Sequence, residues 1–235
     1  MKTVFIRARQ GTANEKATSI KAAASGSNTN RFQIELSTLR QIPGTPFAYW
    51  ISDNVRRLFS EFDPFESGDR IVRQGGVTGD DFRFVRCAWE VLSRSKSRGL
   101  RWVPFAKGGS AGRWYSNYPV VVAWDDKRST FWGYIGLKHR PTIRPSSVEH
   151  YFRPGLTWPL RAARFAPVPM PEGTIFSIRG YAIIAPKQDL LAICAVGQST
   201  VFDYIFKVAL GRLEFPEFVV GTLQRLPFPS LSGKD

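Results

Sequence analysis

The spacing of hydrophobic residues changes along this chain, and its first part reads as strand, helix, strand. Thr3 to Arg9 alternates apolar and polar residues, as a half-buried strand does. Asn14 to Ala24 is rich in Ala, Lys and Glu and predicts a helix, and Arg31 to Leu36 predicts a second short strand. We therefore expect an N-terminal strand-helix segment.

A helical period follows the break at Ile42-Pro43-Gly44-Thr45-Pro46. Apolar residues recur between Phe47 and Phe62 at the spacing of an amphipathic helix, which puts Arg56 and Arg57 on its outer face. Asp63-Pro64 ends the pattern.

The middle of the chain predicts many short, twisted strands. Arg70 to Arg73 is a strand candidate, and Phe82 to Leu92 fits either a helix or a strand. From Arg101 to Pro186 a Pro or Gly interrupts the chain every few residues, a pattern typical of short strands. Three tryptophans stand in apolar, periodic surroundings and are predicted to lie in the core: Trp50, Trp89 and Trp124.

The last part returns to a helical pattern. Gln188 to Val196 and Ser199 to Leu210 predict a helical hairpin around Gly197, and Gly221 to Leu226 predicts a short helix. The whole pattern predicts an α+β fold, in which short twisted strands form a mixed sheet and a helical hairpin closes the chain. We divide it into a connecting segment (1–66), a central domain (67–187) and a C-terminal helical brace (188–235).

The distribution of charged residues indicates the kind of binding partner. The 235 residues carry a formal net charge of +14 at pH 7. Val91 to Pro171 alone holds fourteen Lys and Arg against three acidic residues, a net of +11. Such a concentrated excess points to a polyanion, although a solvated basic surface is the alternative.

Cysteine and histidine usage restricts the chemistry. Cys87 and Cys194 are far apart and form no CxxC pair, so the sequence suggests neither a zinc site nor a disulfide framework. His139 and His150 are the only histidines, which leaves little material for a metal site. The N-terminus carries charges where a signal peptide needs an apolar core, and no apolar run approaches the roughly 20 residues that cross a bilayer. We therefore expect a cytoplasmic protein that has no membrane partner.

The strongest candidate site lies between Arg101 and Trp124. A basic, glycine-rich loop, Lys107, Gly108, Gly109 and Arg113, adjoins Trp114 and Tyr115. Glycines let the backbone approach a ligand closely, and basic side chains beside flat rings suit phosphates and bases. The loop therefore predicts a nucleic-acid contact. The alternatives are a hairpin turn with solvated ends and, for Trp114 and Tyr115, a place in the core.

Catalytic motifs are missing from the sequence. It contains no G-x-G-x-x-G, Walker or G-x-S-x-G pattern. The acidic doublets Asp80-Asp81 and Asp125-Asp126 are predicted to be turns or helix caps. An adenine methyltransferase would need an Asn/Asp-Pro-Pro-aromatic tetrad, whereas Phe62-Asp63-Pro64-Phe65 has one proline and is predicted to stop a helix. We expect no catalytic residue and no cofactor site in this chain.

Three segments nevertheless occur in a familiar order. They are IPGTPFAYW (Ile42–Trp50), TGDDFRF (Thr78–Phe84), and KGG followed by RWYSN (Lys107–Gly109 and Arg113–Asn117). They resemble the C-terminal target-recognition region of adenine-specific DNA methyltransferases of phage-defence (BREX, phage-growth-limitation) systems and of related type IIG restriction-modification enzymes. Two departures stand out: the family's Asn between the aspartates is missing, and Ser116 replaces a usual Gly.

The resemblance implies a role in reading DNA. In the family this region recognises the sequence of duplex DNA while the methyltransferase domain, which binds S-adenosylmethionine, flips and methylates adenine. That domain is absent here, so residues 1–66 would be its tail, and the chain is expected to be inactive alone. The predicted DNA-binding residues are Lys107, Gly108, Gly109, Arg113, Trp114, Tyr115, Thr78, Asp80, Arg83, Lys138, Arg140 and Arg144.

Other interpretations stay open at this point. Four arginines flank the Thr78-Gly79-Asp80 turn and could contact DNA or form local salt bridges: Arg70, Arg73, Arg83 and Arg86. Arg161, Arg164 and Arg179 are weaker candidates for phosphate contacts. The chain could instead be a separate specificity subunit that recruits a catalytic methyltransferase partner to DNA, or an RNA-binding protein that stacks bases on aromatic rings.

Overall fold

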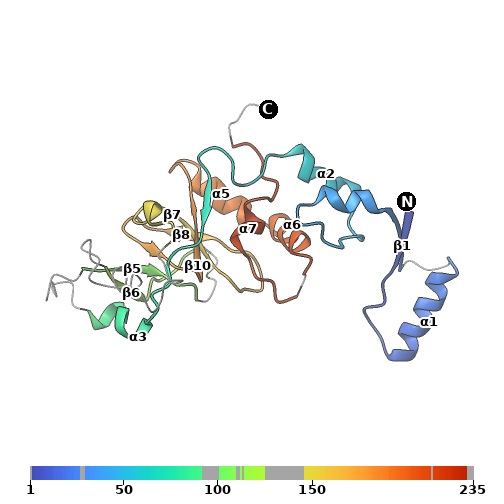
Figure 1. Cartoon of the computed structure of the whole chain (residues 1–235), viewed down its shortest axis with the longest axis horizontal. Coiled ribbons are helices and arrows are strands. Elements are labelled where there is room, and N and C mark those ends of the chain that lie inside the picture. The colour runs from blue at the N-terminus through green and yellow to red at the C-terminus, as the bar shows by residue number, and fades with distance from the viewer. Residues whose placement is uncertain are drawn as a thin grey trace, which may run out of the picture.

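The computed structural model describes residues 2–26, 30–91, 101–109, 112, 114–124, 146–212 and 214–231. The molecule is elongated, with β1 (Lys2–Ile6) and α1 (Ala13–Ala24) at one end and α3 (Asp81–Phe84), β5 (Arg101–Ala106) and β6 (Val120–Trp124) at the other (Figure 1). Helices and sheets both contribute, which confirms the α+β prediction.

The N-terminal unit is a small hairpin with a helix inserted between its strands. β1 pairs antiparallel with β2 (Arg31–Glu35), and α1 lies between them in the chain. Thr12 and Glu15 cap α1 reciprocally: Glu15 Oε2 accepts from the Thr12 N–H at 2.6 Å, and Thr12 Oγ1 accepts from the Glu15 N–H at 3.4 Å. The Phe5 ring stacks on Tyr49 with centroids 4.6 Å apart, which attaches the hairpin to the next segment.

That next segment corrects one expectation. After η1 (Leu36–Gln41), the helix α2 spans Asp53–Glu61 and is capped by Ser52, so it begins later than predicted. Arg56 was predicted to face outward, yet only 3% of it is exposed. Its guanidinium lies 2.6 Å from Asp53 and donates to the Ala48 carbonyl at 3.4 Å, because the turn before α2 leaves carbonyls that need donors.

Among the described residues, two four-stranded sheets form the central part. The first has the order β3 (Ile71–Arg73), β10 (Gly180–Ile184), β7 (Gly155–Pro159), β8 (Val168–Met170) and is antiparallel. The second has the order β4 (Val85–Cys87), β6, β5, β9 (Ile175–Phe176), and its β5–β9 pair is parallel. This pairing accounts for the predicted mixed sheet.

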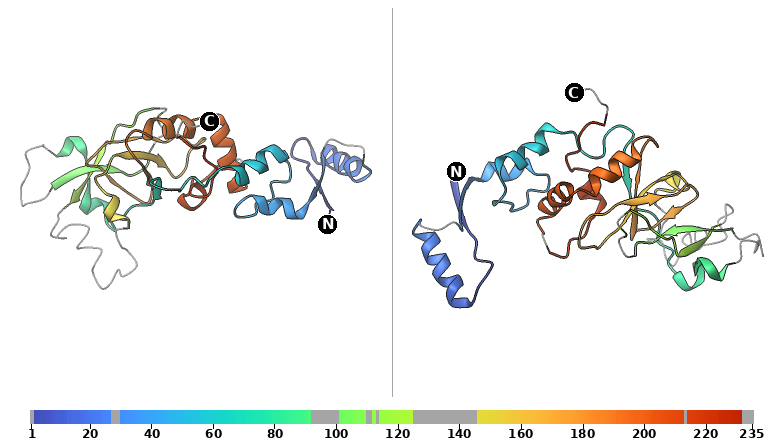
Figure 2. Two further views of the ribbon diagram at one scale, coloured as in Figure 1. Left: turned by 90° about the horizontal axis from the view of Figure 1, so that it is seen from above. Right: turned by 180° about the vertical axis from the view of Figure 1, so that it is seen from behind.

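Alternate residues of β10 belong to two different hydrophobic clusters, one on each face of the first sheet. Ala182 and Ile184 belong to the cluster shared with the second sheet, whereas Tyr181 and Ile183 belong to the cluster shared with the helices. The first sheet therefore lies between the second sheet and α5 (Leu190–Gly197), α6 (Thr200–Leu210) and α7 (Val220–Leu223) (Figure 2).

The helical core crosses the predicted domain boundary at residues 187 and 188. It joins Leu156, Trp158 and Phe165 to Phe202, Phe206 and Phe218. The division into three domains stays a prediction. The predicted pair of C-terminal helices is present, and α5 and α6 meet at a bend of 70°. In the described part of the chain, no single helix is long and apolar enough to cross a membrane; α5 and α6 meet that criterion only as a bent pair.

The predicted core positions of the three tryptophans are only partly confirmed. Trp124 is buried, and Trp50 is partly buried against the cluster of Ile42, Ala48, Ile51 and Val208. In contrast, 75% of Trp89 is exposed, so its predicted core position was wrong. The ambiguous segment forms α3, β4 and then η2 (Ala88–Glu90), whose start is held to the Pro119 carbonyl by the Ala88 N–H at 2.8 Å. The chain turns at this sheet edge, and the indole projects into solvent.

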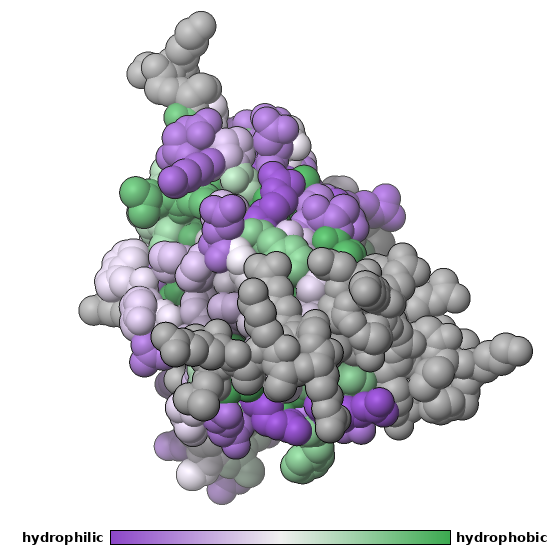
Figure 3. Space-filling model, turned by 90° about the vertical axis from the view of Figure 1, so that its left-hand side faces the viewer, coloured by the Kyte–Doolittle hydropathy of each residue, from purple (hydrophilic) through white to green (hydrophobic). Residues whose placement is uncertain are grey.

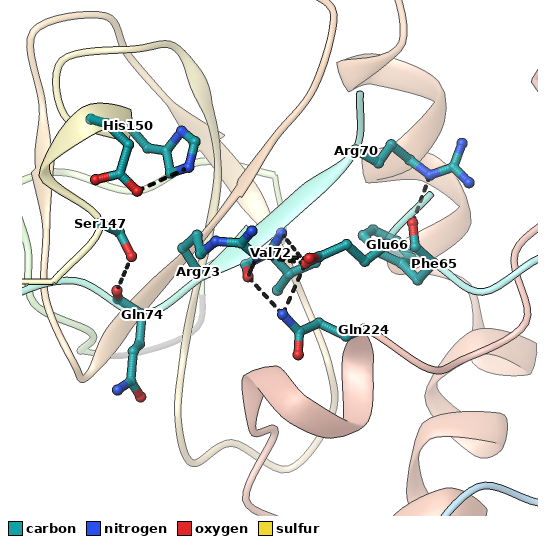
Figure 4. A network of polar contacts seen from close by, with 10 residues as sticks. Phe65, Glu66, Arg70, Val72, Arg73, Gln74, Ser147, His150 and Gln224 are labelled. Carbon is teal, nitrogen blue, oxygen red and sulfur yellow. Dashed lines mark hydrogen bonds and ion pairs between the residues drawn. The ribbon is translucent and has the colours of Figure 1, made fainter. Parts of the chain in front are cut away.

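Glu66 fixes the edge strand β3 to the helical layer. Its carboxylate accepts from the Val72 N–H at 2.9 Å, Arg73 at 2.8 Å and Gln224 at 2.9 Å (Figure 4). Partial burial opposes the charged form, but these hydrogen bonds outweigh it and lower the pKa of Glu66. The network joins residues from β3 and from the turn after α7.

Candidate nucleic-acid interface

The turn before α3 is organised by its two aspartates. The Asp80 side chain accepts from the Arg83 N–H at 3.1 Å and caps α3, which confirms the predicted cap. Gly79 has a φ of +74°, a conformation that favours glycine. Thr78 donates its hydroxyl hydrogen to Asp81. Thr78, Asp80 and Arg83, all predicted DNA-binding residues, thus belong to one compact turn.

Asp81 also binds Lys107, which stands at the end of β5. This ion pair joins the two sequence motifs that were predicted separately. Partial burial opposes the charge of Asp81, but hydrogen bonds from Lys107 and Thr78 and the charge of Lys107 lower the pKa of the carboxyl. The Lys107 ammonium, predicted to contact DNA, lies 5.9 Å from the centroid of the Phe105 ring and is partly exposed.

Gly108 and Gly109 follow in conformations with φ of +83° and +117°. A Cβ atom on Gly108 would lie 2.6 Å from the Arg179 carbonyl oxygen, and one on Gly180 would lie 2.7 Å from the Gly108 nitrogen. The loop therefore packs directly on the backbone before β10. Only glycine fits both the backbone conformation of Gly108 and the available space.

Beneath this loop is a cavity of about 310 Å³ between the two sheets. The residues that line it include Lys107, Gly108, Gly109, Tyr118 and Thr157. The Tyr118 hydroxyl donates to the Pro169 carbonyl at 2.6 Å, and burial raises the pKa of Tyr118. Sequence reasoning missed the cavity, because its walls come from strands that are distant in the chain.

Exposed aromatic rings accompany the loop. Trp114 is 59% exposed and Tyr115 72% exposed, so neither fills the core and their predicted contact with DNA stays open. Phe82 is 95% exposed and was not predicted as a site residue. In Figure 3, which views this end of the molecule, hydrophobic groups form separate patches between hydrophilic ones on the part of the face that the described residues form.

Several arginines make local contacts. Arg73 pairs with Glu66 at 2.8 Å, and Arg70 donates to the Phe65 carbonyl at 2.9 Å (Figure 4). Arg86 donates to the Phe82 carbonyl at 2.5 Å. Two of the weaker candidates are also held locally, since Arg161 pairs with Glu217 and Arg164 donates to the Gln198 carbonyl. Of the Arg70 and Arg73 pair, Arg73 therefore forms the local salt bridge that was the alternative to a DNA contact.

Four predicted DNA-binding residues, Arg113, Lys138, Arg140 and Arg144, lie outside the described residues, as does His139. His150 is described and lies in η4 (Val148–His150), with its Nε2 3.4 Å from Glu149. Burial lowers the pKa of His150, and the charge of Glu149 opposes this shift. Among the described residues, no three His, Cys, Asp or Glu side chains are grouped so that they could hold a metal ion.

Comparison with known proteins gives a distant relative. No family model matches the chain. Over 174 residues the chain is 25% identical to the "Adenine-specific methyltransferase PglX" of Lacticaseibacillus casei (strain Zhang). The match covers 69% of this chain but 14% of the relative, so the chain spans a small part of that protein's length. The chain is thus distantly similar to a region of an adenine-specific methyltransferase.

Proposed function

We propose that this chain is the DNA sequence-recognition part of an adenine-specific (N6) DNA methyltransferase of a restriction-modification or phage-defence (BREX-like) system. It binds duplex DNA through the surface around Lys107, Gly108 and Gly109. The catalytic part, which binds S-adenosylmethionine and flips the target adenine, is a further domain or a partner subunit.

The observation that carries this proposal is the junction of Thr78, Asp81 and Lys107. Two segments that resemble separate motifs of methyltransferase recognition regions meet here in three dimensions. The similarity to PglX over 69% of the chain supports the link to an adenine-specific methyltransferase. Because the ion pair holds α3 against the glycine loop, the two segments can approach DNA as one rigid surface.

The residues of this surface suit a duplex. Backbone N–H groups of a glycine loop can bind phosphate oxygens at close range, and exposed aromatic or polar side chains can reach base edges or sugars. The Trp114 and Tyr115 rings are available for such contacts because both are exposed. The formal charge of +14 provides the long-range attraction.

Duplex binding by the full chain tests the proposal. Fluorescence anisotropy with a labelled duplex at about 50 mM salt should show binding, and affinity should fall by about a thousandfold at 200 mM if roughly six phosphates are contacted. Repeated selection from a random duplex pool should enrich one sequence. Absence of duplex binding, or stronger binding to single-stranded RNA, would contradict the proposal.

Charge-removal variants locate the surface. Lys107→Ala should weaken duplex binding about three- to tenfold, since it removes a charge and releases α3 from the loop. Lys21→Ala is the matched control, because Lys21 is an exposed lysine on α1 at the opposite end of the molecule (Figure 1). Equal losses in both variants would indicate unspecific attraction of DNA by the whole chain.

Methyl transfer tests the division of labour. With labelled S-adenosylmethionine and the selected duplex, this chain alone should incorporate no methyl group. Incorporation above a no-protein blank would place the catalytic site in this chain and contradict the proposal.

A further inference from the structure

Phe82 is a large apolar side chain with almost no protein contact. Its exposed fraction of 95% is the highest among the exposed large hydrophobic residues of the described chain. It stands at the second position of α3, within the turn that meets the glycine loop. Local packing therefore gives no reason for an aromatic ring at this position.

The backbone that carries this ring is held on every side. The preceding Asp80 caps the helix, and Asp81 is bound by both Thr78 and Lys107. The carbonyl of Phe82 itself accepts from the Arg86 guanidinium at 2.5 Å. A ring on such a support loses little backbone freedom when it meets a partner, which is the condition for an effective contact.

The charge around Phe82 identifies the partner. Asp80 and Asp81 precede it, Arg83 and Arg86 follow it, and Lys107 pairs with Asp81, so three basic side chains stand against two acidic ones. Phe215 is also 94% exposed, but it follows α6 and is not part of the junction between α3 and the glycine loop. The ring of Phe82 therefore projects from the surface that is proposed to bind DNA, and the small excess of positive charge around it fits a polyanionic duplex.

We propose that Phe82 is a wedge, whose ring inserts between adjacent base pairs of the bound duplex and partly unstacks them. Apolar side chains such as Phe act in this way in proteins that kink DNA. The proposal rests on the DNA-binding function inferred above and adds the distortion of the duplex to it. A rigid four-residue helix is suited to present one ring, while the phosphates are held by the basic loop next to it.

The test uses the full chain and the duplex recovered by selection, with 2-aminopurine in place of each adenine in turn. The wild-type chain should increase 2-aminopurine fluorescence at one base step, because unstacking relieves the quenching of this base. Phe82→Ala should abolish that increase and weaken binding by about tenfold or less, since lost stacking is offset by the unstacking that is no longer needed. Phe82→Leu should keep part of the increase.

Phe215→Ala is the matched control and should behave as the wild type in both measurements. Circular dichroism should be the same for all variants, since both rings are exposed. A fluorescence increase that survives in Phe82→Ala, or wild-type binding without any increase, overturns the wedge and leaves the proposed function intact. Failure of the wild-type chain to bind duplex DNA instead contradicts the proposed function, and the wedge with it.

Discussion

Asp81 links two segments through one carboxylate. It accepts from Thr78 in its own turn and pairs with Lys107 from the end of β5. It differs in role from its neighbour Asp80, which only caps α3. In the Asp80-Asp81 doublet, Asp80 thus contacts its own helix, whereas Asp81 also contacts a segment that is distant in the chain.

Removal of the Asp81 charge should destabilise the fold in a pH-dependent way. The folded-state pKa of Asp81 is lowered from the ordinary 3.8, so its contribution is present above about pH 4 and is lost as pH falls through the folded-state pKa. Asp81→Asn should lower the free energy of unfolding by about 0.5 kcal/mol at pH 7, because the pair is half exposed. Urea unfolding at pH 7 and pH 3 checks this.

Asp69→Asn, at an exposed turn position, is the control and should change the free energy of unfolding at neither pH. An Asp81→Asn deficit of equal size at pH 7 and at pH 3 would show that the lost contribution does not come from the carboxylate charge.

At the scale of elements, the close approach of the two sheets depends on glycines. Gly75 follows β3 and donates its N–H to the Ser177 carbonyl at 3.2 Å, just after β9. A Cβ atom on Gly75 would overlap the Phe176 carbonyl group. Side chains larger than hydrogen would therefore push β3 and β9 apart, and the two sheets meet here.

Gly75→Ala should consequently lower the free energy of unfolding by about 1–3 kcal/mol, the usual cost of an overpacked interior. The control is Gly221→Ala in α7, where no heavy atom lies within 4 Å of the added Cβ. This second change should be neutral or stabilising, because alanine favours helix. Thermal unfolding of both variants gives the comparison, and a stable Gly75→Ala protein would contradict the described contact.

The N-terminal and C-terminal parts of the chain contribute unequally to the hydrophobic core of the molecule. In the part of the chain that the structure describes, the residues of the three core clusters begin at Ile42, so the hairpin of β1 and β2 with α1 contributes to none of them. The C-terminal helices, in contrast, cover Leu156, Trp158 and Ile183 of the first sheet. Loss of these helices would expose a large apolar surface.

Two truncated chains test this difference. A chain that starts at residue 37 should still unfold cooperatively, with a modest loss from the missing Phe5–Tyr49 stacking. A chain that ends at residue 187 should not unfold cooperatively, because one face of its first sheet is uncovered. Near-ultraviolet circular dichroism during urea unfolding distinguishes the two results. Cooperative unfolding of the second chain would instead support an independent domain over residues 67–187.

Much of the local structure could be predicted from the sequence. The helix over Ala13–Ala24, the strand over Ile71–Arg73 and the short strands between β5 and β10 all follow from hydrophobic period and from turn residues. The errors fall where contacts outside the helix or strand itself decide the outcome: Arg56 is buried by carbonyl groups of the preceding turn, and Trp89 is turned outward at a sheet edge.

The candidate site shows the same division. The sequence alone determined that a basic glycine loop and a Thr-Gly-Asp-Asp turn exist, because glycine, charge and turn chemistry act over a few residues. Only the tertiary structure decided that Lys107 binds Asp81, that a cavity lies beneath Gly108, and that Phe82 is left exposed. Each of these results depends on which strands pair, and strand pairing is set by the burial of apolar faces across the whole chain.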